Sequence, residues 1–95
     1  MSVRLVITLK AAPGKGNELT AAFRERCTQV TQEPGCEQFE VFQSAIDPDR
    51  LTLLELWTDQ AALDVHAKVN TTRAPLPEGL LAGSEREDYV YNRVR

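Results

Sequence analysis

Apolar residues occupy every second position near the start of the chain. Over residues 3–10 this period of two predicts a β-strand with one buried face. The same alternation returns over residues 37–44, 51–57 and 87–94, which predicts three further strands. Over residues 15–32 apolar positions instead recur every three or four residues, which predicts an amphipathic helix. The apolar positions of that helix are Leu19, Ala22, Phe23, Cys27 and Val30.

Turn-forming residues separate these segments. Pro34-Gly35 ends the first helix, because proline cannot continue it and glycine tolerates a left-handed cap. The Asp-Pro-Asp stretch at residues 47–49 supplies a turn between the second and third strands. Asp59, or the threonine before it, can cap a second helix that continues to about Val69.

The resulting order is strand, helix, strand, strand, helix, strand, which is the ferredoxin-like α+β pattern with a four-stranded antiparallel sheet. Ninety-five residues fit one domain, so we assign residues 1–95 to a single domain. Residues 70–84 have no clear period and contain prolines and glycines, which predicts a loop that is either a functional cover or mobile. Residues 80–82 could form one helical turn within it. The simpler interpretation is that its leucines plug the end of the core.

The predicted third strand is apolar on both faces. Leu51, Leu53 and Trp57 share one face, whereas Leu54 and Leu56 share the other. Two helices cover only one face of such a sheet, and an exposed apolar sheet face is a partner-binding surface. A chain of this length also often gains stability by oligomerising. We therefore predict a homodimer.

Charge and composition exclude several partners. The net charge of −3 leaves no basic footprint for nucleic acid or an anionic membrane, and no apolar run is long enough to span a bilayer. The first residues alternate rather than forming an apolar signal segment, so we expect a cytoplasmic protein. Cys27 and Cys36 match no zinc or redox spacing, and we expect two free, mostly buried thiols.

His66, the single histidine, is the best candidate for acid–base chemistry. It shares a helix face with Leu63 and Ala67, and a histidine in water has a pKa of about 6.5, which suits a base at neutral pH. The alternative is a histidine that closes the edge of the core or bonds the backbone. We expect no metal and no organic cofactor, because the sequence has no tetrahedral ligand set, phosphate loop, or flavin or nicotinamide fingerprint.

Aromatic residues provide candidate substrate contacts. Trp57 could form a wall for a flat substrate, although a tryptophan more often anchors a core or an interface. Phe39 and Phe42 point to opposite faces of their strand, so one can line a cavity while the other packs under the helices. Candidate hydrogen-bond donors to a phenolic oxygen are Tyr89, Tyr91 and Arg73.

Glu55 is a carboxylate in apolar company. It shares a strand face with Leu53 and Trp57, so its pKa is raised or it is paired with a cation. Arg4 and Arg93 are the candidate partners. A structural ion pair at the sheet or the dimer interface is the favoured interpretation.

The order of elements between residues 33 and 66 carries a family resemblance. A helix stop at residues 33–35 is followed by a strand, a turn, a strand ending in Trp57, and a helix carrying His66. This order and these residue types resemble the antibiotic-biosynthesis monooxygenase (ABM) family, including its quinol-oxidising members. The resemblance implies a dimeric α+β barrel. It also implies that O₂ oxidises a small quinol, phenolic or polyketide-like aromatic without metal or flavin.

The resemblance also implies roles for particular residues. Such an enzyme needs a base, an apolar pocket and donors that hold a phenolate, for which His66, Trp57 and one tyrosine are available. Polyketide-tailoring members have an asparagine where this chain has Leu53 and a tyrosine where it has Leu63. Haem-degrading relatives add an asparagine on the first strand, which this chain lacks. The alternatives are a non-catalytic dimeric module that binds a small ligand, and a haem-binding or haem-degrading relative.

Overall fold

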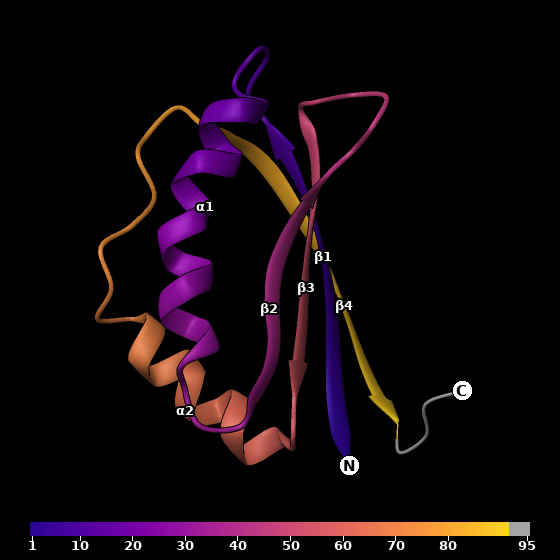
Figure 1. Ribbon diagram of the computed structural model, residues 1–95, viewed down its shortest axis with the longest axis vertical. Helices are drawn as coiled ribbons and strands as arrows, with labels where there is room; N and C mark the ends of the chain where they lie inside the picture. Colours follow the sequence, from indigo (N-terminus) through magenta and orange to yellow (C-terminus); the bar gives the residue numbers. More distant parts are fainter. Residues whose placement is uncertain (92–95) are drawn as a thin grey trace.

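The computed structural model describes residues 1–91 and contains the elements in the predicted order. The strands form one antiparallel sheet in the order β2-β3-β1-β4. Both helices lie on the same side of this sheet (Figure 1). The predicted ferredoxin-like fold is therefore confirmed. The elements are β1 (Ser2–Ala11), α1 (Gly16–Thr31), β2 (Cys36–Gln43), β3 (Arg50–Trp57), α2 (Gln60–Asn70) and β4 (Leu81–Tyr91).

The two faces of β3 differ as its alternating sequence predicts. Leu51, Leu53 and Trp57 are buried on the helix side, whereas Leu54 and Leu56 are half-buried on the open side. Burial of the apolar face holds the helices on the sheet, because removing apolar surface from water is the main favourable term in folding. No helix within residues 1–91 has the length and apolar character needed to cross a membrane. Other core residues are Val3, Leu5 and Leu9 of β1 with Leu19, Phe23 and Val30 of α1.

The turn between β2 and β3 anchors the start of α1. The Asp49 carboxylate accepts hydrogen bonds from the backbone N–H groups of Gly14 and Gly16, each at 2.9 Å. The first N–H groups of a helix have no partner within it, so this carboxylate caps the helix from another segment. Gly16 also permits close packing, because a Cβ at this position would lie 1.7 Å from the carbonyl oxygen of Pro48.

The end of α1 packs against the start of α2 at Gly35. Its φ of +80° is a left-handed conformation that favours glycine, and a Cβ would lie 2.5 Å from the Cβ of Ala62 in α2. At the start of α2 the Asp59 carboxylate accepts a hydrogen bond of 2.8 Å from the N–H of Ala62, as a predicted N-cap does. This close approach brings Glu33, which precedes the turn, within reach of α2.

The last strand is longer than the sequence predicts. It begins at Leu81 rather than at residue 87, so the helical turn considered for residues 80–82 is wrong. The early part forms because residues 81–84 pair with the end of β1, where the register shifts between Lys10 and Ala11. Leu80 is buried in the core, which agrees with the expectation that leucines plug its end. The predicted strand end at residue 94 lies outside the described residues.

Candidate active site

A cleft of about 410 Å³ lies between the sheet and the helices. Leu5, Leu53 and Glu55 line it from the sheet, with Phe39 on β2 and His66 on α2. A small cavity with mostly apolar lining and a few polar groups is typical of small-molecule sites. A wider hollow of about 780 Å³ at the β2–β3 turn has no histidine or aromatic lining. The other polar residues of the cleft are Arg26, Gln60, Asp64, Asn70 and Arg86.

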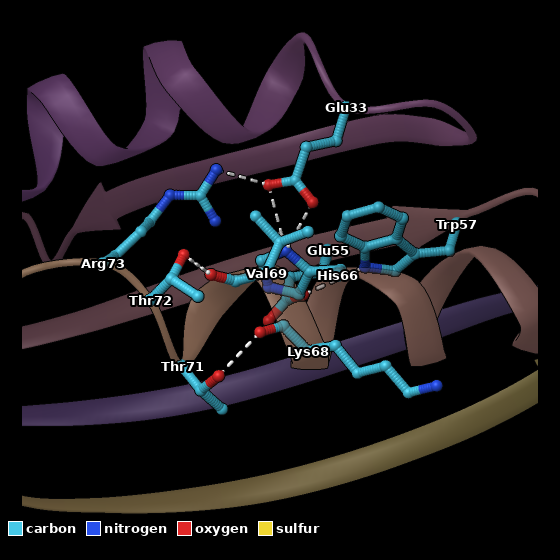
Figure 2. Close-up of polar contacts among 9 residues, drawn as sticks. All are labelled: Glu33, Glu55, Trp57, His66, Lys68, Val69, Thr71, Thr72 and Arg73. Carbon is cyan, nitrogen blue, oxygen red and sulfur yellow. Dashed lines mark hydrogen bonds and ion pairs between the residues drawn. The ribbon is translucent and has the colours of Figure 1, made fainter.

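His66 is held between two aromatic rings. Its imidazole lies 4.7 Å from the Trp57 ring and 5.7 Å from the Phe39 ring, measured between centroids. Only 7% of the residue is exposed, because α2 directs it towards the sheet. Figure 2 shows the imidazole beside the Trp57 indole, with Glu33 near its other edge. The packing leaves the ring few orientations.

Glu33 fixes the imidazole from outside the cleft. Its Oε1 lies 3.0 Å from Nδ1 of His66, and its Oε2 lies 2.7 Å from Nη2 of Arg73 (Figure 2). A carboxylate can only accept, so Nδ1 of His66 carries the proton and donates it. Glu33 comes from the turn after α1 and Arg73 from the segment after α2. The bonds therefore join two segments that are distant in the sequence.

This arrangement decides which imidazole nitrogen is available. With Nδ1–H donated to Glu33, a neutral imidazole has its lone pair on Nε2. Within residues 1–91, Nε2 of His66 has no hydrogen-bond partner. His66 lines the cleft whereas Glu33 does not, so the edge that contains Nε2 is the one available to a ligand.

Glu55 is the second titratable group on the cleft. It is only 4% exposed, and its Oε1 accepts a hydrogen bond of 3.0 Å from Nε1–H of Trp57. Burial raises the pKa of the Glu55 carboxyl, an effect that the Trp57 bond and the nearby His66 reduce. Arg4 was one predicted ion-pair partner of Glu55. Its guanidinium donates to the backbone carbonyl of Glu55 rather than to the carboxylate. Arg93, the other predicted partner, lies outside the described residues.

The fold agrees with the family found by sequence comparison. Residues 2–74 match the family described as Antibiotic biosynthesis monooxygenase. The chain belongs to this family. Membership supports a monooxygenase-like function for this family member. A comparison with curated proteins gives no match.

Solved structures share the fold over nearly the whole chain. Protein PA3566 of Pseudomonas aeruginosa is 26% identical, with a TM-score of 0.81, over 97% of this chain and 95% of that chain. Protein SO0527 of Shewanella oneidensis is 28% identical, with a TM-score of 0.77, over 93% and 88%. An antibiotic biosynthesis monooxygenase is 23% identical, with a TM-score of 0.74, over 98% and 99%, and shows likeness of fold alone.

Three of the sequence-predicted site residues meet in this family member. His66 and Phe39 line the cleft. Trp57 has no exposed surface, so it supports His66 and Glu55 from behind rather than lining the cleft. The structure therefore supports the core-anchor interpretation of Trp57, and this anchor also contacts two residues of the candidate site. A role for Trp57 as a wall for the substrate stays a prediction.

The other predicted contacts lie elsewhere. Phe42 and Tyr89 are exposed on the open face of the sheet, and the Tyr89 hydroxyl donates to Glu87 at 2.7 Å. Arg73 binds Glu33 behind the imidazole instead of lining the cleft. The side chain of Tyr91 lies outside the described part of the structure. A role for these residues in substrate binding stays a prediction.

Sequence reasoning missed Glu33. The residue lies 33 positions before His66 and has no motif spacing to it. One signal was present, because a glutamate directly before Pro34-Gly35 sits at the helix stop that the family resemblance singles out. Its partners become apparent only when α1 and α2 are placed side by side.

The described residues offer little to a metal or to thiol chemistry. Within residues 1–91 no three His, Cys, Asp or Glu side chains are grouped to hold a metal ion. Cys27 and Cys36 are free, as predicted, but both are half-buried rather than mostly buried. Burial raises the pKa of the Cys36 thiol to about 11, and Glu33 and Glu55 add to the effect. The thiolate is the reactive form, so Cys36 is a poor nucleophile at neutral pH.

Proposed function

We propose that this family member is a cofactor-independent monooxygenase that oxidises a small quinol, phenolic or polyketide-like aromatic with O₂ in the cleft. The observation that carries the proposal is the orientation of His66. Its Nδ1 is fixed by Glu33 while its Nε2 edge borders an apolar cleft beside Phe39. A positioned base of this kind typically contributes about 10²–10⁴-fold to a rate.

The chemistry needs a base more than it needs a cofactor. O₂ is a triplet in its ground state and reacts slowly with closed-shell molecules. A phenol that loses its proton to Nε2 of His66 becomes an electron-rich phenolate that can donate an electron to O₂. The apolar side chains of the cleft favour an aromatic ligand, and Phe39 offers a ring to a flat substrate.

We also propose that a second copy of the chain covers the open face of the sheet. Leu54 and Leu56 are half-buried there, and Phe42 is exposed, with no helix above them. An apolar sheet face of this kind is a partner-binding surface. The family resemblance supports a symmetric dimer of this sort, in which each copy keeps its own cleft.

The test is oxygen consumption by metal-stripped protein with a panel of hydroquinones, naphthohydroquinones and anthrones. We expect uptake above the spontaneous rate in wild type and a loss of about 10²-fold or more in His66→Ala. Val65→Ala, an exposed neighbour on α2, is the matched control and should keep wild-type uptake. Equal uptake by His66→Ala would remove His66 as the base.

A non-catalytic ligand-binding module is the second candidate, because the same apolar cleft can bind an aromatic without turnover. Saturable binding of panel members, with no uptake above background in wild type, would favour that function. Haem is a separate ligand for which a Soret shift on titration is the readout, and we expect none.

A further inference from the structure

Glu55 also lines the cleft, but the proposed reaction gives it no role so far. It lies in the middle of β3 and lines the same cleft as His66, yet it is almost completely buried. Its Oε1 accepts from Trp57, but its second carboxylate oxygen has no hydrogen-bond partner within residues 1–91. Unlike Nη1 of Arg73, this oxygen is not a fully buried atom without a partner among the described residues, so it is open to a ligand in the cleft.

A purely structural role does not account for this oxygen. To hold the Trp57 indole, the chain needs one acceptor at position 55, and a glutamine would supply it without burying an ionisable group. Arg86, which also lines the cleft, donates to Asp88 at 2.6 Å and 3.1 Å and forms no ion pair with Glu55 within residues 1–91. A carboxyl placed in this way resembles the buried acids that enzymes use as proton donors.

The charges around Glu55 come from several elements. His66 on α2 and Arg86 on β4 favour its ionised form, whereas Asp88 on β4 disfavours it. The thiol of Cys36, at the start of β2, also responds to its charge. Burial outweighs these neighbours and raises the pKa of the Glu55 carboxyl, so it keeps its proton to higher pH than an exposed glutamate.

We propose that Glu55 is the proton donor of the cleft and acts together with His66 when the oxygen–oxygen bond breaks. This rests on the proposed monooxygenase function. The two groups border one cavity, so a substrate can contact Nε2 of His66 and the free oxygen of Glu55 in the same complex.

The proton balance gives each group a task. His66 takes the phenolic proton, the phenolate joins O₂ at a ring carbon that still carries hydrogen, and the protonated His66 returns its proton to the peroxide oxygen. His66 then removes the hydrogen of that carbon as the C=O bond forms and the O–O bond breaks. The departing hydroxide takes the proton of Glu55 and leaves as water. Transfer from protonated His66 to ionised Glu55 restores both groups, so one phenol and one O₂ give one quinone and one water.

The decisive variant is Glu55→Gln, which keeps an acceptor for Trp57 Nε1–H but has no acidic proton. We expect it to consume O₂ and accumulate the substrate hydroperoxide, because O–O cleavage lacks its proton donor. The yield of quinone and water per O₂ should fall about 10²-fold, the scale of a lost general acid. Glu40→Gln, at an exposed glutamate on β2, is the matched control. It makes the same chemical change away from the cleft, so the quinone yield per O₂ should stay close to that of wild type.

A second readout needs no substrate. Infrared difference spectra between wild type and Glu55→Gln at neutral pH should show the carbonyl band of a neutral carboxylic acid. An ionised carboxylate in its place overturns the inference. If wild type consumes O₂ and Glu55→Gln gives the same quinone yield, the role of Glu55 is overturned but the proposed function stands. If wild type consumes no O₂, the proposed function and the role of Glu55 are both overturned.

Discussion

Glu33 accepts hydrogen bonds from two side chains through its two carboxylate oxygens. One oxygen accepts from His66 and the other from Arg73, and the carboxylate is largely buried. Such charge-assisted bonds are stronger than bonds between neutral groups and hold the carboxylate in one orientation. Glu33 does not itself line the cleft, so we expect it to affect the chemistry there through the His66 imidazole.

Glu33→Gln should alter the imidazole without removing it. The amide can donate to Nδ1 of His66, so the population with the proton on Nδ1 should fall. The change is visible in nitrogen NMR, where the single histidine gives an unambiguous signal. Oxygen uptake should fall by about 10–100-fold, comparable to the loss of orienting partners at metal-bound histidines. Glu37→Gln, on exposed β2 surface, should change neither quantity, and a wild-type nitrogen spectrum in Glu33→Gln would contradict the assignment.

Glu55 gives the stability of the protein a pH dependence of known sign. Its pKa in the folded state is raised by burial above the ordinary value of 4.5, so the folded chain holds the proton more tightly. The resulting stability is complete below pH 4.5 and is lost as the pH rises through the folded-state value. Glu55→Gln should therefore gain stability relative to wild type between about pH 4 and pH 7. Urea unfolding at both pH values measures this, and a constant difference would count against it.

Among the elements, α1 depends on the turn between β2 and β3. Asp49 accepts from the N–H of Gly16, the first residue of the helix, and from the N–H of Gly14 just before it, whereas the N-cap residue Lys15 makes no side-chain cap bond. Asp49→Ala should lower the free energy of unfolding by about 1 kcal/mol, within the range of a lost helix cap. Asp49→Asn keeps one acceptor oxygen and should lose less. Urea denaturation of wild type and both variants measures these free energies of unfolding. Equal stability of wild type and Asp49→Ala would refute the cap.

The elements themselves were largely predictable, because each carries its own period. β3 and α1 have clear alternating or helical patterns and formed where expected. The start of β4 was missed because residues 81–84 become a strand by pairing with distant β1 rather than by local preference. Only part of the candidate site was predictable from the sequence. His66 and Phe39 could be found from residue type and face, whereas the Glu33 contact depends on helix packing across the turn at Gly35.

At the scale of the whole molecule, the sheet offers a cleft on one face and an uncovered apolar surface on the other. Leu56→Lys would place a charge in the centre of the proposed dimer contact, where burying an unpaired charge is costly. Light scattering should show the wild type at twice the mass of a single chain and Leu56→Lys at the mass of one. Val65→Lys, on the exposed side of α2, should stay dimeric. Wild type with the mass of a single chain at micromolar concentration would contradict the dimer.

The alternation along β3 has an evolutionary consequence. Leu53 and Glu55 belong to the cleft, while Leu54 and Leu56 belong to the opposite face. Substitutions at odd and even positions of β3 can therefore accumulate independently, so a lineage can change the cleft without changing the opposite face of the sheet. An insertion or deletion of one residue has no such freedom, because it exchanges every side chain between the two faces at once. Length variation among natural relatives should accordingly collect in the loops, and β3 should tolerate changes of residue but not of length.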